Sequence, residues 1–390
     1  GQNMIKRNHA FSFFEFFAGG GMVRAGLGGG WDCLFANDYD LKKASSYREN
    51  WGEKELVVAD IGSLDMRDIN GRPDLVWGSF PCQDLSLAGG GAGLKGNRSG
   101  TFWPFVSHLR ELKAQGREPS VIALENVMGT LTSNGGKDFQ AICEALQALG
   151  YIFGAVMIDA IEFVPQSRPR LFILAVKRDL PLPPNIALTG AQDYRHPKSI
   201  QRALEKFPAK LKSSWRFWNI SRPAIRNSSF RDLIEDQPTS TKWHSKADTE
   251  ALLSMMSEGN LAKVLSAKMS GQFKVGTIYK RTRYESGKKI QRAEVRFDDV
   301  AGCLRTPAGG SSRQLIMLVE GEKIRSRLIS TRETARLMGL PEHYVLPSAY
   351  NQAYHLTGDG VAVPVVRHIS EQFFEPVLAR AVVKSIRIAA

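Results

Sequence analysis

The sequence predicts an α/β protein with a doubly wound, mostly parallel sheet and a smaller second domain. Between residues 11 and 178, short apolar runs alternate with stretches of helical periodicity. This rhythm is typical of parallel strands joined by crossover helices. Between residues 195 and 330 the periodicity weakens, and this segment holds 27 Lys/Arg but only 13 Asp/Glu. The whole chain of 390 residues has a net charge of +13, so this one segment carries the entire excess.

The composition narrows the class of protein. Hydrophobic residues make up 43% of the chain and charged residues 23%, which excludes a disordered or fibrous chain. No apolar run approaches the roughly 20 residues needed to cross a bilayer, so we expect no membrane partner. The cysteines Cys33, Cys82, Cys143 and Cys303 lack metal-ligand spacing, which predicts reduced thiols in the cytoplasm and no metal site.

Seven apolar runs are the expected strands. They cover residues 11–17, 33–36, 56–59, 75–80, 121–124, 152–158 and 170–176. Helices are predicted over 139–149, where apolar residues recur at i, i+3, i+4 and i+7, and over 331–338, capped by Ser330 or Thr331. The proline-rich stretch 179–184 is typical of a linker. We therefore expect a domain over 1–184, a basic domain over 185–345, and a C-terminal segment, 346–390, that returns to the first domain.

The first three expected strands end in residues that suit a nucleotide-like ligand. A glycine-rich turn, residues 17–22, follows the first strand, Asp38 ends the second, and Asp60 ends the third. Glycine lets the backbone turn sharply and approach a ligand closely, and an acidic residue about 20 positions later can bond a ribose hydroxyl. Together they predict an adenosine-containing cofactor at the carboxyl edge of the sheet. The turn lacks the Gly-Lys-Ser/Thr of a P-loop, so nucleotide hydrolysis is not expected.

The fourth expected strand ends in a proline and a cysteine, Pro81 and Cys82. A single cysteine at a strand end is commonly a small buried hydrophobe. Here Pro81 stiffens the turn that would expose the thiol, and the glycine-rich stretch 89–98 has the composition of a closing lid. These two features favour a nucleophile.

The fifth expected strand ends in a carboxylate, Glu125. Beside a thiol it suggests acid chemistry on the substrate that the thiol attacks, whereas the alternative is a Glu that accepts backbone bonds at a helix start. Arg168 and Arg170 enter the last strand at i and i+2. Residues at that spacing point the same way from a strand, so both are expected to face an anionic or carbonyl-bearing substrate.

The basic segment is interleaved with aromatic residues, a composition typical of nucleic-acid binding. The alternative is a solvated basic surface over an ordinary core. The densest basic stretch supplies five candidate phosphate contacts, which are Lys280, Arg281, Arg283, Lys288 and Lys289.

The motifs, in this order, resemble the DNA cytosine-5 methyltransferases of bacterial restriction–modification systems. The resemblance covers nearly the whole chain except the basic segment. It rests on Phe-Ala-Gly-Gly-Gly at 17–21, Asp60-Ile61, Pro81-Cys82-Gln83, Glu125-Asn126-Val127, Gln-Ser-Arg-Pro-Arg at 166–170, and the motifs at 332–341 and 358–361.

The resemblance implies the S-adenosylmethionine-dependent methyltransferase fold and assigns catalytic roles. Cys82 would attack C6 of a flipped-out cytosine. Glu125 would hold N3 and the exocyclic amine, and Arg168 and Arg170 would steady the base carbonyl and the catalytic carboxylate.

The resemblance also implies S-adenosyl-L-methionine as the cofactor and S-adenosyl-L-homocysteine as its product. Asp38 would bind the ribose and Asp60 the adenine amino group, and Asp359 stands where an Asn is commoner in the family. The implied cofactor residues are Phe17, Ala18, Gly19, Gly21, Asp38, Tyr39, Asp60, Ile61, Phe80, Pro81, Asp359 and Val361.

Double-stranded DNA is the implied partner, and the basic domain would recognise the target. The expected DNA contacts are Gln83, Ser86, Lys95, Arg98, Lys280, Arg281, Arg283, Lys288, Lys289, Ser311, Ser312 and Arg313. We expect a monomer at the bacterial nucleoid, with a separate cognate restriction endonuclease as a possible partner. Two alternatives remain: the same chemistry on tRNA, and an inactive module that binds cofactor and DNA. The long basic segment argues against the first, and the intact Cys82, Glu125 and Arg168 argue against the second.

Overall fold

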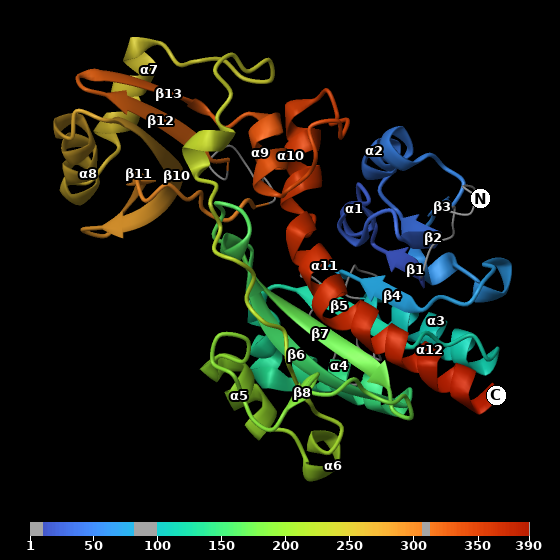
Figure 1. Cartoon of the computed structure of the whole chain (residues 1–390). Coiled ribbons are helices and arrows are strands. Elements are labelled where there is room, and N and C mark those ends of the chain that lie inside the picture. Colours follow the sequence, from blue (N-terminus) through green and yellow to red (C-terminus); the bar gives the residue numbers. More distant parts are fainter. Residues whose placement is uncertain (1–10, 82–99, 306–312, 390) are drawn as a thin grey trace. The chain divides into compact units, whose positions relative to one another are not determined.

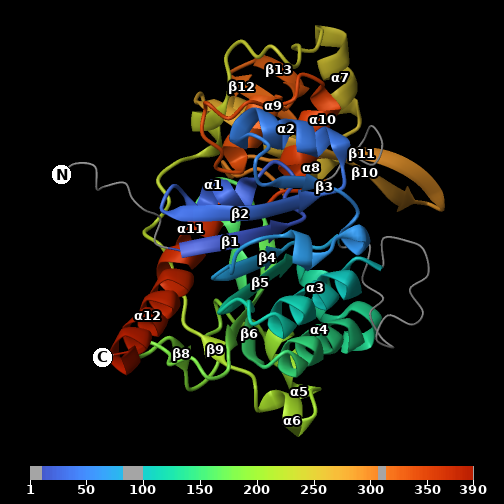
Figure 2. The same ribbon diagram turned by 90° about the vertical axis from the view of Figure 1, so that its right-hand side faces the viewer.

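The structure is a computed structural model that describes residues 11–81, 100–305 and 313–389. It divides into two compact units, each with its own sheet and core. The first unit comprises Gly1–Asp159, Pro169–Arg222 and Val365–Ala390, and the second comprises Ala160–Arg168 and Pro223–Pro364. Figures 1 and 2 show the elements of both units from two directions.

The first unit is built on a mostly parallel sheet, as predicted. Within the described residues its seven strands have the order β3-β2-β1-β4-β5-β7-β6. Neighbouring strands from β3 to β5 pair in parallel, and β7 pairs antiparallel with both β5 and β6. All seven expected strands are confirmed. They are β1 (Phe11–Phe16), β2 (Trp31–Asp38), β3 (Leu56–Val58), β4 (Leu75–Gly78), β5 (Val121–Asn126), β6 (Tyr151–Asp159) and β7 (Pro169–Lys177).

Helices cover both faces of this sheet. On one face, α3 and α4 bury Phe102, Phe105 and Phe139 in the same core as strand residues. On the other face, the ring of Phe374 packs edge-on against Trp31 of β2 and Trp77 of β4. The ring centroids are 6.3 Å apart in the first pair and 6.2 Å apart in the second. The helices of this unit are α1 (Met22–Leu27), α2 (Leu41–Trp51), α3 (Phe102–Ala114), α4 (Lys137–Ala148), α5 (Lys198–Glu205), α6 (Ala209–Lys212) and α12 (Glu375–Ala389), and α11 (Val363–Ile369) joins it from the second unit.

The expected helix over 139–149 is confirmed as α4. Its Phe139, Ile142, Cys143 and Leu146 are all buried, which is the predicted i, i+3, i+4, i+7 stripe. Burying a side chain of this size stabilises the fold by about 1.5–3 kcal/mol, so this stripe fixes α4 on the sheet.

The proline-rich stretch after β7 does not end the first unit. Residues 185–222, expected in the basic domain, pack back onto the sheet and include β8 (Ala187–Leu188) and β9 (Phe217–Trp218). Trp218 is fully buried and donates its indole N–H to the Leu174 carbonyl of β7 at 2.8 Å. The Phe153 N–H of β6 donates to the Ser214 carbonyl at 2.9 Å. Burial of these apolar residues places the unit boundary near residue 222 rather than 184.

The second unit contains an antiparallel sheet with the order β11-β10-β12-β13 among the described strands. Its strands are β10 (Phe273–Glu285), β11 (Lys288–Arg296), β12 (Leu315–Glu320) and β13 (Lys323–Leu328). Its helices are α7 (Lys246–Ser254), α8 (Glu258–Met269), α9 (Thr331–Leu337) and α10 (Tyr350–Gly358). The expected helix over 331–338 is confirmed as α9, which Ser330 caps in a capping box with Glu333. Residues 346–364 lie in this unit, so the return to the first unit comes at residue 365 rather than 346.

Across the described ranges, no helix is long and apolar enough to cross a membrane.

Candidate active site

The carboxyl end of β1 turns sharply at the predicted glycine-rich segment. Phe17, Gly19 and Gly21 all have positive φ, at 56°, 53° and 77°. A Cβ at Gly21 would lie 2.3 Å from the indole nitrogen of Trp51, so this glycine is required for packing. A Cβ at Gly19 would approach nothing closer than a Lys43 side-chain carbon at 4.0 Å, so space is open beside the turn.

Asp38, at the end of β2, anchors that turn. One of its carboxylate oxygens accepts the Gly19 N–H at 2.8 Å, and the other accepts the Asp40 N–H at 2.9 Å. Burial raises the pKa of Asp38, while the N–H of Asp40, the charge of Lys43 and the N–H of Gly19 oppose that rise. Each carboxylate oxygen can accept more than one bond. Asp38 therefore has remaining capacity for a ligand hydroxyl, and Tyr39 beside it is 52% exposed.

The third expected ligand contact follows β3. Asp60 is exposed, and its carboxylate accepts the Gly62 N–H at 2.7 Å, which caps the short 3₁₀ turn Ile61–Ser63. Ile61 is buried, and its carbonyl lies 2.6 Å from Nε2 of His108 on α3. The ends of β1, β2 and β3 thus present a bent backbone, two carboxylates and apolar surface at one edge of one sheet.

Glu15, near the end of β1, is a buried acid that sequence reasoning missed. It is 1% exposed, and burial raises its pKa to about 8. The charge and backbone N–H of Arg24 and the backbone N–H of Val23 act in the opposite direction. The signal in the sequence was an acidic residue, Glu15, inside the apolar run of residues 11–17.

Glu125 and Arg170 come together on adjacent strands. The Nε atom of Arg170 lies 3.7 Å from a carboxylate oxygen of Glu125, and both side chains are largely buried. Glu125 is on β5, and Arg170 is on β7, the antiparallel neighbour of β5. A guanidinium beside a carboxylate restricts the orientation of that carboxylate, so Arg170 can hold Glu125 in place as a hydrogen-bonding group.

Asn126 links this pair to the end of β4. Its side-chain amide donates to the Phe80 carbonyl at 3.3 Å and accepts the Val127 N–H at 2.8 Å. Phe80 is buried against Phe102, and Pro81 is the last described residue before position 82. Asn126 therefore fixes the strand end from which the chain continues to Cys82. The sequence prediction included Asn126 in a motif but gave it no role.

The expectation that Arg168 and Arg170 point the same way from one strand is wrong. β7 begins at Pro169, so Arg168 lies before the strand, in the second unit. Its guanidinium is buried and donates to the carbonyls of Leu304, Gly358 and Gly360 at 2.9, 2.7 and 2.9 Å. Arg168 therefore holds together segments of the second unit.

The last two expected cofactor residues also belong to the second unit. Asp359 is exposed directly after α10, and Val361 is 5% exposed. The carbonyls that Arg168 binds, those of Gly358 and Gly360, flank Asp359 on both sides.

The described cysteines differ from one another in burial. Burial raises the pKa of Cys33 to about 12 and also raises that of Cys143. The thiolate is the nucleophilic form, so neither thiol is suited to attack a substrate. Cys303, in the second unit, is partly exposed.

Several predicted site residues lie outside the described residues. They are Cys82, Gln83, Ser86, Lys95, Arg98, Ser311 and Ser312, together with the expected lid over 89–98.

The predicted phosphate contacts lie on the β10–β11 hairpin of the second unit. Arg283 Nε donates to Glu294 at 2.7 Å, and Arg281 Nε is 3.4 Å from Glu294. Lys280, Lys288 and Lys289 form no ion pair with any described residue. Arg313, elsewhere in this unit, donates to the Asn351 side chain at 2.9 Å.

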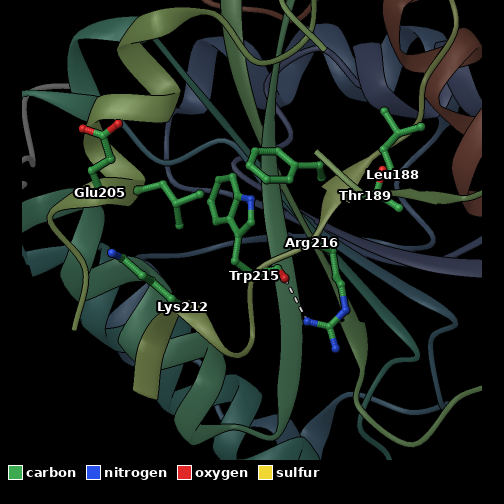
Figure 3. A pocket seen from close by; sticks show the side chains of 8 residues that line it. Leu188, Thr189, Glu205, Lys212, Trp215 and Arg216 are labelled. Carbon is green, nitrogen blue, oxygen red and sulfur yellow. Dashed lines mark hydrogen bonds between the residues drawn. The ribbon is translucent and has the colours of Figure 1, made fainter. Parts of the chain in front are cut away.

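The basic segment is divided between the units. Eight of its 27 Lys/Arg residues, from 195 to 222, belong to the first unit, and the other nineteen belong to the second. A pocket of about 400 Å³ lies in the part of the basic segment that belongs to the first unit. Figure 3 shows that Lys212 and Arg216 lie near Trp215 in this pocket. The Arg216 guanidinium donates to the Trp215 carbonyl at 2.8 Å. None of the predicted site residues lines this pocket.

Within the described part of the chain, no group of three or more His, Cys, Asp or Glu side chains is placed to hold a metal ion.

Comparison with known proteins identifies the family. The family model for C-5 cytosine-specific DNA methylases matches residues 11–375. The type II methyltransferase M.HhaI of Haemophilus parahaemolyticus is 24% identical over 360 residues, which are 92% of each chain. M.Bsp6I of a Bacillus species is 26% identical over 376 residues, covering 93% of this chain and 98% of the other.

Solved structures agree with this at the level of the fold. A DNMT2 variant of Spodoptera frugiperda superposes with a TM-score of 0.59 at 17% identity, over 94% of this chain and all (100%) of the other. The family match extends from β1 to the start of α12. The chain therefore belongs to the C-5 cytosine-specific DNA methylases, which transfer a methyl group from S-adenosylmethionine to cytosine in DNA.

Proposed function

We propose that this enzyme methylates C5 of a cytosine flipped out of duplex DNA, through a covalent adduct with Cys82. The observation that supports this most strongly is the arrangement at the ends of β4 and β5. There Glu125 is paired with Arg170, and Asn126 is bonded to the Phe80 carbonyl, two residues before Cys82.

The chemistry explains why a thiol and a carboxylate are needed together. Cytosine C5 is a poor nucleophile, and addition of a thiolate at C6 turns the ring into an enamine whose C5 can accept a methyl group. Loss of the C5 proton and departure of the thiolate then restore the aromatic ring. A free cysteine has a pKa of about 8.5, so the surroundings of Cys82 must favour the thiolate.

Glu125 is proposed to hold the base during this addition. As the thiolate adds at C6, N3 of the ring takes up a proton from the Glu125 carboxyl group, and that proton returns to Glu125 when the thiolate leaves. Glu125 also accepts a hydrogen bond from the exocyclic amine. Arg170 lies beside Glu125 and orients it. Arg168 is proposed to act as a positioning residue of the second unit, because its donors are bound to backbone carbonyls.

The turn after β1 and the ends of β2 and β3 are proposed to bind S-adenosylmethionine. The open space beside Gly19 and the acceptor capacity of Asp38 fit such a ligand. Asp38 would accept from the ribose, Asp60 would accept from the adenine amino group, and Tyr39 or Ile61 would lie against the ring. The cofactor supplies the methyl group as an electrophilic carbon on a sulfonium ion. In this proposal Phe80 and Pro81, which follow β4, add further contacts. The expectation that Asp359 and Val361 also contact the cofactor stays a prediction.

Duplex DNA is proposed to bind through the second unit, which would act as the target-recognition domain. Flipping the target base out of the stack costs a few kcal/mol, and binding must supply that energy. We further propose that the enzyme works as a monomer on the bacterial chromosome and that a cognate endonuclease, where one exists, acts separately.

Methyl transfer to defined substrates tests the proposal. Wild-type enzyme should transfer the methyl group of labelled S-adenosylmethionine to duplex DNA and not to tRNA of the same host. Cys82→Ala should abolish transfer while leaving the binding of DNA and cofactor largely intact. Turnover by this variant within tenfold of wild type would overturn the role of Cys82, and preference for tRNA would overturn the choice of substrate.

A further inference from the structure

The end of the β10–β11 hairpin stands apart from the rest of its sheet. Pairing between β10 and β12 ends at Ile278, whereas pairing between β10 and β11 continues to Glu285 and Lys288. From Tyr279 onward the hairpin is therefore a two-stranded ribbon. In Figure 2 this ribbon extends beyond the other elements of the second unit.

The turn at its end has a defined geometry. Ser286 and Gly287 both have positive φ, at 50° and 74°. This is the conformation of a two-residue type I′ turn, whose twist matches the strands it joins. The turn fixes the register, so the side chains that share each face of the ribbon are known.

One face of the ribbon pairs its arginines with carboxylates. Arg281, Arg283 and Glu285 of β10 share this face with Lys288, Ile290, Arg292 and Glu294 of β11. Glu294 binds Arg281 and Arg283, and Glu285 accepts from Nε of Arg292 at 3.0 Å. Each carboxylate on this face is therefore committed to arginine, and the arginines offer little free charge to a partner.

The opposite face has a different composition. Lys280, Thr282 and Tyr284 of β10 share it with Lys289 and Gln291 of β11. Four of these five side chains are exposed, and Tyr284 is 74% exposed. No acidic residue of the ribbon lies on this face, and neither lysine forms an ion pair with a described residue.

Nearer the sheet, this same face is apolar and packed. Ile278, Ala293 and Val295 lie on it and belong to the core formed with α7 and α8. This face changes from apolar to polar and basic at the point where α7 and α8 no longer pack against it. A basic, polar face with an exposed aromatic side chain has no role in the core of its own unit, and its charge is complementary to a polyanion.

We propose that this face, composed of Lys280, Thr282, Tyr284, Lys289 and Gln291, is the surface through which the hairpin binds duplex DNA. This inference rests on the proposed function of the second unit. A two-stranded β-ribbon fits the major groove, which is about 12 Å wide. Lys280 and Lys289 contact phosphates, and the arginine face points away from the DNA.

Thr282 and Gln291 are the base-reading pair of this face. They lie directly opposite each other across the two strands, where Cβ atoms are about 4.5–5.5 Å apart. A Gln can bond both N6 and N7 of adenine, and Thr can bond an edge or contact the thymine methyl group. Together they can read adjacent positions of one site.

Matched double variants on the two faces test the proposal. K280Q/K289Q and R281Q/R283Q each remove two positive charges from the same ribbon. The measurement is the salt dependence of binding to a duplex that the wild-type enzyme methylates. Each phosphate contact contributes about 0.9 to the log–log slope, so K280Q/K289Q should lower the slope by about two and R281Q/R283Q should leave it near the wild-type value. Thermal unfolding of each variant confirms that the hairpin remains folded.

A third variant tests the base-reading pair. Gln291→Ala should leave the salt slope unchanged and reduce discrimination between the cognate site and one single-base variant by about tenfold. An unchanged slope in K280Q/K289Q, a larger fall in R281Q/R283Q, or unaltered discrimination in Gln291→Ala would overturn the assignment of this face. Failure of the wild-type enzyme to methylate any duplex would instead overturn the proposed function.

Discussion

Replacing Arg168 by methionine distinguishes a structural role from a catalytic one. The guanidinium donates to the carbonyls of Leu304, Gly358 and Gly360, all at 2.7–2.9 Å, and to the side-chain oxygen of Gln166 at 3.2 Å. The side chain is 2% exposed, so water does not replace these bonds readily. Methionine has a similar length and no donor.

The expected loss in the free energy of unfolding follows from the carbonyl groups that lose their hydrogen-bond donor. A buried acceptor left unsatisfied costs about 1–3 kcal/mol, and three are affected. The largest effects of single substitutions reach about 4–5 kcal/mol, so we expect Arg168→Met to destabilise the second unit by about 3–5 kcal/mol. With a urea dependence of about 2–3 kcal/mol per molar, the midpoint of unfolding should fall by about 1–2.5 M.

Urea unfolding followed by fluorescence of Trp243, which lies in the second unit, is the assay. A chain with two units can unfold in more than one step, so the transition of this unit must be resolved. Arg168→Lys is the matched control: it keeps the charge but lacks the planar fork, and it should fall between wild type and Arg168→Met. A variant with the wild-type midpoint but no methyl transfer would refute the positioning role and assign Arg168 to the substrate.

Two further predictions concern the first unit. Asp60→Ala should weaken S-adenosylmethionine binding by about 1–3 kcal/mol, because a hydrogen bond to the ligand is lost; unchanged cofactor affinity in calorimetry would remove Asp60 from the site. Glu15→Gln should alter the pH dependence of stability. Burial raises the pKa of Glu15 from its ordinary value of 4.5 to about 8 in the folded protein. The folded protein therefore holds the Glu15 proton more tightly than the unfolded protein does. The stability gained from this protonated side chain is full below pH 4.5 and declines as the pH rises toward 8. The glutamine variant should lose less stability over this range, and equal losses measured by denaturation would contradict the shift.

The core of the fold was predictable because burial leaves a direct pattern in the sequence. Each strand of the seven-stranded sheet contains a short apolar run, and α4 contains an apolar stripe at helical spacing. These patterns depend only on local periodicity. Ser330 was likewise predictable as a cap, because its partner Glu333 lies three residues away.

The unit boundary was not predictable from local signals. The prolines at 179–184 have the composition of a linker, yet Trp218 packs against β7 through a bond to Leu174. That contact joins residues 44 positions apart, and nothing in the sequence near residue 184 encodes it. Long-range packing determined the boundary.

The same limit applies to charged residues. Arg281 and Arg283 look identical to Lys280 and Lys289 as candidates for phosphate contacts, because the sequence shows only their charge. The strand register brings Glu294 beside both arginines and leaves the lysines on the other face. The dipeptide Ser286-Gly287 between two alternating runs was the signal that could have revealed this hairpin.

Arg168 lies one residue before the start of β7, and this determines which groups its side chain can contact. Alternation along a strand would place Arg168 and Arg170 on one face. Because β7 begins at Pro169, the alternation does not reach Arg168. The sequence could suggest that both arginines matter, but only the structure separates the one that pairs with Glu125 from the one that binds carbonyls.

Trapping of the covalent adduct tests whether Cys82 attacks the target cytosine. The enzyme is incubated with S-adenosylmethionine and a duplex that carries 5-fluorocytosine at the methylated position, a position first identified by mapping methylated cytosines in DNA from expressing cells. Fluorine cannot leave as the C5 proton does, so elimination stalls after methyl transfer. We expect a stable protein–DNA complex whose peptide map places the link at Cys82, and no complex with Cys82→Ala. Methylation of the natural duplex without any adduct on the fluorinated one, or an adduct at another cysteine, would contradict the covalent role of Cys82.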